Sequence, residues 1–146
     1  MAPLAATLDV VAEALRDARA PWWVIGSAAA WLHGAATTVD DVDVLLGGDD
    51  ARAMIAGWTG RVTLGAAGER FRSSPIARLS GAALPIEVMT GLHVRVADGW
   101  RAVAPATRTP VGRVYVPERG ELIAILTLFG RQKDRHRVEL LRAGPG

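Results

Sequence analysis

The spacing of apolar and polar positions changes along the chain, and this predicts an alternation of helices and strands. Residues 5–18 repeat apolar side chains at helical spacing, which predicts an amphipathic first helix. The run 22–25 is almost wholly apolar and predicts a strand that we expect at the centre of a sheet. A short helix over 28–33, closed by Gly34, then leads to a second strand over 41–46.

The second half continues this alternation with shorter elements. After Gly47-Gly48, either Asp49 or Asp50 can cap a helix that starts at Ala51. Short strands are expected at 61–64, on both sides of the Ser80-Gly81 turn, and at 112–116, whereas 94–110 gives no firm period and predicts an irregular connection with at most one short strand. An apolar helix should run from Pro117-Glu118 to Gly130, followed by a basic helix over 134–141 and a frayed tail.

These elements predict a single α/β (α+β) domain over residues 1–146, with a central mixed β-sheet flanked by helices. Half of the residues are hydrophobic and 22% are charged, which favours a compact domain. The absence of cysteine excludes disulfides and cysteine nucleophiles, and it favours a cytoplasmic location. We expect neither a signal peptide nor a membrane-spanning segment, because no apolar run approaches the roughly 20 residues that a bilayer requires.

The basic residues give a pI near 9.9 but a net charge of only +2, and they are spread along the chain. A local cluster lies near the C-terminus, at Arg131, Lys133, Arg135, His136 and Arg137. It is either a surface that faces phosphate groups or the solvated face of a helix. A nucleic-acid-binding module rests on this cluster alone, so we do not expect nucleic acid as a partner.

The strand over 41–46 carries two acids at alternate positions, Asp41 and Asp43. Side chains alternate along a strand, so both carboxylates should lie on one face, with Asp40 facing away. Two adjacent anions repel unless a cation lies between them, and oxygen ligands favour Mg²⁺. The alternative is that these acids are merely exposed where a turn enters the strand.

A Gly26-Ser27 turn precedes the acidic pair at the start of a helix. Glycine permits close backbone approach, and free N–H groups at a helix start favour phosphate. Ser27 can equally serve as a simple helix cap. Glu87 stands between Ile86 and Val88 in an apolar strand, where it is either a third site carboxylate or a residue on the wet face of an edge strand.

Gly26-Ser27, thirteen intervening residues and Asp41-Val42-Asp43-Val44 resemble the signature of the nucleotidyltransferase superfamily. Within it, the chain is most similar to minimal nucleotidyltransferases, AbiEii-type toxins and aminoglycoside nucleotidyltransferases. Pro85-Ile86-Glu87-Val88 is placed like the strand with the third acid of the family, and the segment 130–134 resembles a basic-acidic motif of related proteins. Many relatives carry an arginine shortly before the acidic pair, where this chain has Ala35-Ala36-Thr37-Thr38.

The resemblance implies Mg²⁺-dependent transfer of a nucleoside monophosphate from an NTP to an acceptor hydroxyl, with release of pyrophosphate. Asp41, Asp43 and Glu87 would be the catalytic and metal-binding residues; Gly26, Ser27 and Lys133 would bind the nucleotide, and Arg137 would not. The acceptor would be a small molecule or a protein. The alternative is a catalytically degenerate protein of the same fold that binds a partner, as an antitoxin or an assembly module.

Overall fold

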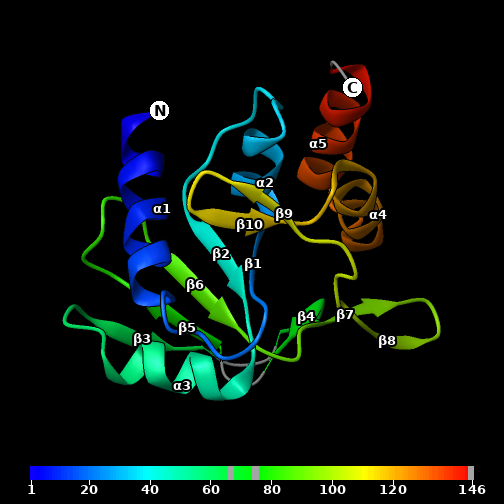
Figure 1. The fold of residues 1–146 in the computed structure, drawn as a ribbon. Helices are drawn as coiled ribbons and strands as arrows, with labels where there is room; N and C mark the ends of the chain where they lie inside the picture. The colour runs from blue at the N-terminus through cyan, green and yellow to red at the C-terminus, as the bar shows by residue number, and fades with distance from the viewer. Residues whose placement is uncertain (66–67, 74–75, 145–146) are drawn as a thin grey trace.

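A five-stranded mixed sheet organises the chain, as a computed structural model shows for residues 1–65, 68–73 and 76–144 (Figure 1). Residues 66–67, 74–75 and 145–146 lie outside this range, and the last pair belongs to the predicted tail. Strands β2 and β6 pair in parallel, and the other neighbours in the sheet pair antiparallel. In spatial order the strands are β1 (Trp23–Ile25), β2 (Val42–Leu45), β6 (Ile86–Met89), β5 (Ile76–Leu79) and β3 (Val62–Leu64).

The described helices flank this sheet on several sides, which confirms the predicted fold class. In Figure 1, α1 lies on one flank, the adjacent pair α4 and α5 on the other, and α3 at the bottom of the view. No helix of the described residues is long and apolar enough to cross a membrane. The helices are α1 (Ala2–Ala14), α2 (Gly26–Leu32), α3 (Gly48–Ala56), α4 (Arg119–Phe129) and α5 (Gln132–Ala143).

The segment 94–110 is more regular than its sequence predicts. It contributes to a three-stranded sheet of β4 (Phe71–Arg72), β7 (His93–Val96) and β8 (Gly99–Ala102), and it contains the start of β9 (Thr109–Val111). Strand β9 pairs with β10 (Val114–Val116). The expectation of one short strand was wrong because β8 and β9 are half exposed and bury no continuous apolar face that a pattern could reveal.

The predicted central position of the first strand was also wrong, because β1 is an edge strand of the main sheet. Its side chains are nevertheless covered, since the β9–β10 hairpin lies against it (Figure 1). The indole N–H of Trp23 donates to the carbonyl of Thr107 over 2.8 Å, and Trp22 meets Tyr115 edge to face. An apolar run in the sequence therefore indicates that the side chains of a strand are buried. It does not indicate that the strand has hydrogen-bonded neighbours on both edges.

The start of α3 likewise differs from the prediction. The helix begins at Gly48, and neither Asp49 nor Asp50 caps it. The buried carboxylate of Asp50 instead accepts hydrogen bonds from the backbone N–H groups of Arg19 and Ala20, at 2.9 and 3.0 Å. Asp50 thereby supplies acceptors for the backbone N–H groups of the loop that enters β1. These residues are too distant in sequence for a local pattern to show the contact.

Helix α4 sets the position of the basic helix that follows it. Its inner face buries Leu122, Ile125, Leu126 and Phe129 in the core. Full burial of such side chains contributes about 1.5–3 kcal/mol each, which fixes the helix on the sheet. Gly130 ends α4 in the left-handed conformation, with φ of 68°, as predicted. After this turn, the start of α5 lies beside the strands that carry Asp43 and Glu87, which are β2 and β6.

Candidate active site

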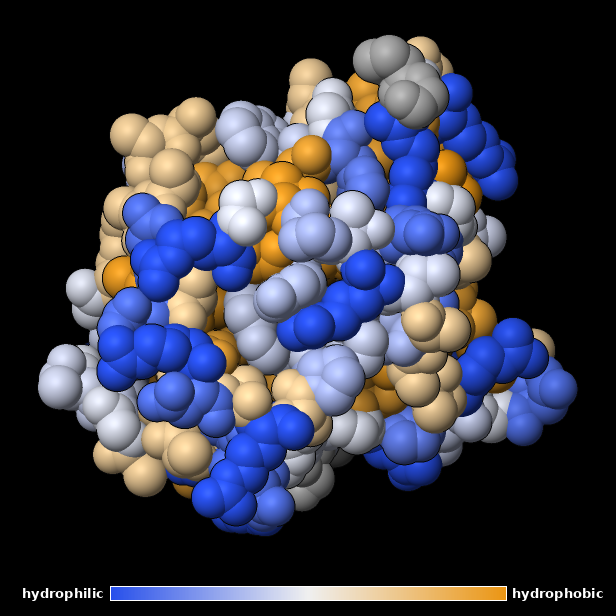
Figure 2. All heavy atoms as spheres, in the orientation of Figure 1, coloured by the Kyte–Doolittle hydropathy of each residue, from blue (hydrophilic) through white to orange (hydrophobic). Residues whose placement is uncertain are grey.

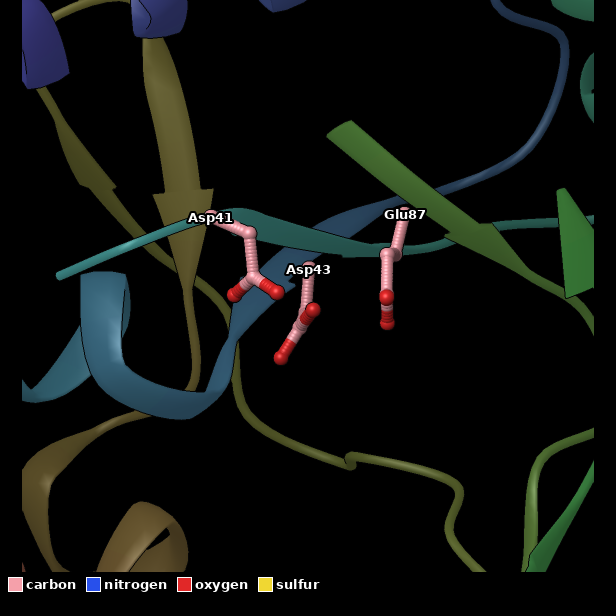
Figure 3. Close-up of side chains that lie close together, drawn as sticks. All are labelled: Asp41, Asp43 and Glu87. Atoms are coloured by element: carbon pink, nitrogen blue, oxygen red, sulfur yellow. The ribbon is translucent and has the colours of Figure 1, made fainter. Parts of the chain in front are cut away.

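Parallel pairing of β2 with β6 places the predicted acids next to one another. Asp43 lies directly opposite Glu87 in the register, and Asp41 immediately precedes β2. Because β6 lies between β2 and β5, Glu87 is not on an edge strand. The three carboxylates point to the same side of the sheet (Figure 3). The structure thus brings Asp41, Asp43 and Glu87 together, while their roles stay predictions.

These residues form what we call the carboxylate cluster: Asp41, Asp43 and Glu87. One oxygen of each carboxylate lies within 4.8 Å of the others. That spacing suits a shared divalent cation with oxygen ligands, and it is costly for three bare anions. A cation is therefore the natural partner of the cluster.

Asp43 is the most strained member electrostatically. Among the described residues, its buried Oδ1 has no hydrogen-bond partner. Burial is the largest cause that raises the pKa of Asp43, followed by the neighbouring charges of Asp41 and Glu87. Arg131 and Lys133 act in the opposite direction, and the resulting pKa is about 8 instead of 3.8. A buried acceptor without a donor is the environment that a metal ion satisfies, so the residues present fit Mg²⁺.

Gly26 lies against the other oxygen of Asp43. A Cβ built on Gly26 would come within 2.6 Å of Asp43 Oδ2, and the backbone has φ of +67°. Both the close approach and the left-handed conformation require glycine here. The backbone at the start of α2 therefore borders the carboxylate cluster, as the sequence predicted for this turn.

Ser27 is not the helix cap that one reading of the sequence proposed. Helix α2 begins at Gly26 with Ile25 as its N-cap, so Ser27 occupies the first turn. The residue is buried and lines the same cavity as the carboxylates.

That cavity, which we call the acidic cavity, has a volume of about 270 Å³ and joins the acids to the start of α5. Asp40 is exposed, as expected, yet it lies on the rim. Lys133 lines the cavity, but so does Arg137, contrary to the expectation that Arg137 would not reach the site. The lining residues are Gly26, Ser27, Asp40, Asp41, Asp43, Glu87, Arg131, Lys133 and Arg137.

Arg137 also contacts the segment where many relatives carry an arginine. Its Nε donates to Thr37 Oγ1 over 3.2 Å, and its Nη1 lies 3.7 Å from Asp134. A guanidinium from α5 thus lies beside residues 35–38, although that segment has no arginine of its own. Sequence reasoning missed this because the contact joins residues a hundred positions apart.

Arg78 is a second cation that sequence reasoning missed. It pairs with Glu87 across β5 and β6, and its Nη1 lies 2.6 Å from Glu87 Oε1 and 3.7 Å from Asp41 Oδ2. The guanidinium holds one oxygen of Glu87 and offsets part of the negative charge of the cluster. The sequence did offer one signal: Arg78 stands between the apolar residues Ala77 and Leu79 in β5. Side chains alternate along a strand, so Arg78 faces away from the core.

A larger cavity of about 540 Å³ adjoins the acidic cavity, with Asp43, Glu87 and Arg131 lining both. Apolar side chains dominate its interior, so we call it the apolar cavity. They are Ile25, Phe71, Ile76, Met89, Leu92 and Phe129. Its size is typical of a small-molecule site, and it offers room for a substrate group next to the carboxylates.

No protein-family model and no curated protein sequence matches the chain significantly. Solved structures do. A provisionally assigned nucleotidyltransferase from Thermotoga maritima is 21% identical, with 93% of this chain and 88% of that chain covered and a TM-score of 0.63. The lincosamide antibiotic adenylyltransferase LnuA, bound to lincomycin, is 7% identical over 93% and 94% of the two chains, with a TM-score of 0.61.

A third structure is ANT(2")-Ia in complex with adenylyl-2"-tobramycin. It is 12% identical, over 97% of this chain and 88% of that chain, with a TM-score of 0.54. At such low identity these similarities establish the fold alone. The chain has the fold of the nucleotidyltransferase superfamily.

Proposed function

We propose that this protein transfers a nucleoside monophosphate from an NTP to an acceptor hydroxyl, with Mg²⁺ as cofactor and pyrophosphate as the second product. The observation that carries the proposal is the convergence of Asp41, Asp43 and Glu87, with an oxygen of each within 4.8 Å of the others. The basic side chains of the acidic cavity support it, since a triphosphate needs positive charge. ATP is the donor to test first, because two similar structures are described by adenylyl transfer.

In this proposal each part of the site has a separate task. Asp41 and Asp43 hold the metal, and Lys133 with the Gly26-Ser27 backbone binds the outer phosphates. Bound Mg²⁺ would neutralise charge that develops on the triphosphate. Glu87 completes the metal site or accepts the proton of the acceptor hydroxyl. The acceptor oxygen bonds to the α-phosphorus, and the bond from that phosphorus to the pyrophosphate oxygen breaks.

The first experiment tests the donor side without any acceptor. Mg²⁺ with a non-hydrolysable ATP analogue should raise the melting temperature, and Asp43→Asn should abolish the rise because it removes a metal ligand. Asp17→Asn, at an exposed carboxylate of the 15–22 loop, is the matched control and should keep the rise. An unchanged rise in Asp43→Asn would remove the carboxylate cluster from the site.

The second experiment separates an enzyme from a degenerate binding protein. Glu87→Gln should lower turnover by about a hundredfold or more while NTP binding persists, since the other groups still hold the triphosphate. Lys133→Ala should weaken NTP binding, and Arg135→Ala, at an exposed residue bonded to the Gly130 carbonyl, should not. A wild-type protein that binds Mg²⁺ and NTP but never releases pyrophosphate would support the degenerate alternative instead.

A further inference from the structure

Arg78 differs from most basic residues of this protein in the acids that it meets. Hydrophilic side chains are spread over the face of the molecule that Figure 2 shows, so a basic residue does not by itself mark a site. In the described part of the chain, two arginines form ion pairs with acids that are neighbours in space but not along the chain, Arg78 and Arg113. Arg113 meets Asp9 and Glu13 of α1, whereas both partners of Arg78 belong to the carboxylate cluster.

Strand register places Arg78 in one row with two of the site acids. Asp43 of β2 lies opposite Glu87 of β6, and Glu87 lies opposite Arg78 of β5. Residues directly opposite one another in a sheet project from the same face, so the guanidinium lies on the side of the carboxylates. Arg78 is not among the described residues that line the acidic cavity or the apolar cavity. It therefore meets the carboxylates without facing the space that a substrate would occupy.

Glu87 anchors the guanidinium at this place. Nη1 of Arg78 donates to Glu87 Oε1 over 2.6 Å, a short bond between two charged groups. The same nitrogen lies 3.7 Å from Asp41 Oδ2. The positive charge of Arg78 is therefore held beside two of the three carboxylates instead of moving freely in solvent.

A charge held there opposes the binding of a metal ion. Oxygen ligands lie about 2.1 Å from Mg²⁺, so an ion bound to Asp41 Oδ2 could be no farther than about 6 Å from Nη1. A unit positive charge and a divalent ion at about this separation in water repel each other enough to weaken binding about tenfold. Salt at about 0.1 M screens part of this repulsion and reduces the factor to about threefold.

We propose that Arg78 is a resident counter-charge that keeps the carboxylate cluster from binding free Mg²⁺ tightly, so that the metal site fills only together with an NTP. The inference rests on the proposed function and deepens it, because it states when the metal of that site is bound. The triphosphate brings more negative charge than one guanidinium cancels, and this restores the attraction for the metal. Without a nucleotide, the cluster would stay largely free of metal.

The first test measures metal binding without turnover. Mn²⁺ takes the same oxygen ligands as Mg²⁺, and EPR reports its free concentration during a titration of the full-length protein without nucleotide. At about 0.01 M salt, Arg78→Gln should bind Mn²⁺ about tenfold more tightly than wild type, and at about 0.1 M salt about threefold more tightly. Arg78→Lys keeps the charge and should stay within about twofold of wild type.

Arg113→Gln is the matched control for this titration. Its side chain is 53% exposed, against 44% for Arg78, and it also pairs with two acids, which lie outside the cluster. The affinity of Arg113→Gln for Mn²⁺ should equal that of wild type. If Arg78 served only to support the fold, Arg78→Gln would disorder Glu87 and bind Mn²⁺ more weakly. Weaker or unchanged binding in Arg78→Gln would overturn the proposal.

The second test adds a non-hydrolysable ATP analogue to the same titration. The analogue should tighten Mn²⁺ binding by the same factor in wild type and in Arg78→Gln, because the two electrostatic effects add. A much smaller factor in the variant would mean that Arg78 contacts the nucleotide itself, which would overturn its role as a counter-charge of the cluster.

These titrations also separate this inference from the proposed function. Wild-type protein that binds Mn²⁺ with the analogue, together with an Arg78→Gln variant of unchanged Mn²⁺ affinity, would overturn the inference and leave the proposed function intact. Wild-type protein that binds Mn²⁺ neither alone nor with the analogue would overturn both.

Discussion

Two buried aspartates, in β2 and in α5, have opposite surroundings. Asp134 is fully buried and accepts hydrogen bonds from Arg131 through Nε at 2.6 Å, Nη2 at 3.0 Å and the backbone N–H at 3.2 Å. Asp43 has two carboxylates as neighbours, and its buried Oδ1 finds no hydrogen-bond partner among the residues that the structure describes. Asp134 therefore receives direct hydrogen bonds from a guanidinium and a backbone N–H. The buried Oδ1 of Asp43 receives none from the described residues.

This difference separates a carboxylate that stabilises the fold from one that is held ready for a ligand. Asp134 and Arg131 fix the start of α5, where their reciprocal contacts form a capping box. Asp43 raises the free energy of the metal-free protein, because its charge is desolvated and repelled. Substitutions at the two positions should therefore have opposite consequences for activity and stability.

The largest effect is expected for Asp43→Asn. Turnover should fall by about a thousandfold, because a metal-ligating carboxylate is lost. The metal-free protein should be at least as stable as wild type, since a neutral amide is not repelled by Asp41 and Glu87. Pyrophosphate release and urea denaturation measure the two quantities. A clear loss of stability would show that Asp43 is structural, like Asp134.

Asp134→Ala, in contrast, should lower the stability of the protein. Removing the partner of two partly buried arginines should lower the free energy of unfolding by about 3 kcal/mol. Urea denaturation measures this loss, and Asp49→Ala is the control because Asp49 forms an exposed ion pair with Arg52. A stable Asp134→Ala protein would mean that the two aspartates do not differ in the way proposed.

Stability should also depend on pH through Asp43. Its pKa is raised from 3.8 to about 8 in the folded protein, so the native state binds the additional proton between these values. Stability should therefore fall as the pH rises through this window, by at most about 1.4 kcal/mol per pH unit. Denaturation at pH 5.5 and pH 8 without metal tests this. Asp43→Asn should flatten the difference, and Mg²⁺ should bind more tightly at the higher pH.

The smallest effect compares two glycines in the left-handed conformation. Gly26→Ala should cost about 1 kcal/mol of backbone strain and also displace Asp43, whose Oδ2 would lie 2.6 Å from the new Cβ. Gly34→Ala carries similar strain, with φ of +97°, but its Cβ would meet no atom of the described residues within 4 Å. Metal-dependent stabilisation should weaken in the first variant only. Equal weakening in both variants would show that Gly26 has no specific role beside the metal site.

The sequence predicted the acidic side of the site well, because it depends on local patterns. Alternation along 41–46 placed Asp41 and Asp43 together, and Gly26 marked a close backbone approach. The proximity of Glu87 depended on the parallel pairing of β2 with β6, which a single sequence indicates only through resemblance.

The basic side was mostly invisible in the sequence. Arg78 reaches Glu87 through strand register, and Arg70 reaches Phe129 through a contact 59 positions apart. The edge position of β1 and the strands within 94–110 were missed for a related reason. In each case tertiary packing, rather than the local pattern, decides the outcome.

The register between Asp43 and Glu87 also bears on how this protein can evolve. Deleting one residue from the stretch between the Ser80-Gly81 turn and Glu87 would shift β6 by one position and bring an apolar neighbour, Ile86 or Val88, opposite Asp43. Length changes should therefore be purged from this stretch and accumulate in turns such as Ala97-Asp98, whose residues are exposed and whose strands carry no carboxylate of the cluster. Lineages of this chain should differ in the length of that hairpin long before they differ in the spacing that precedes Glu87.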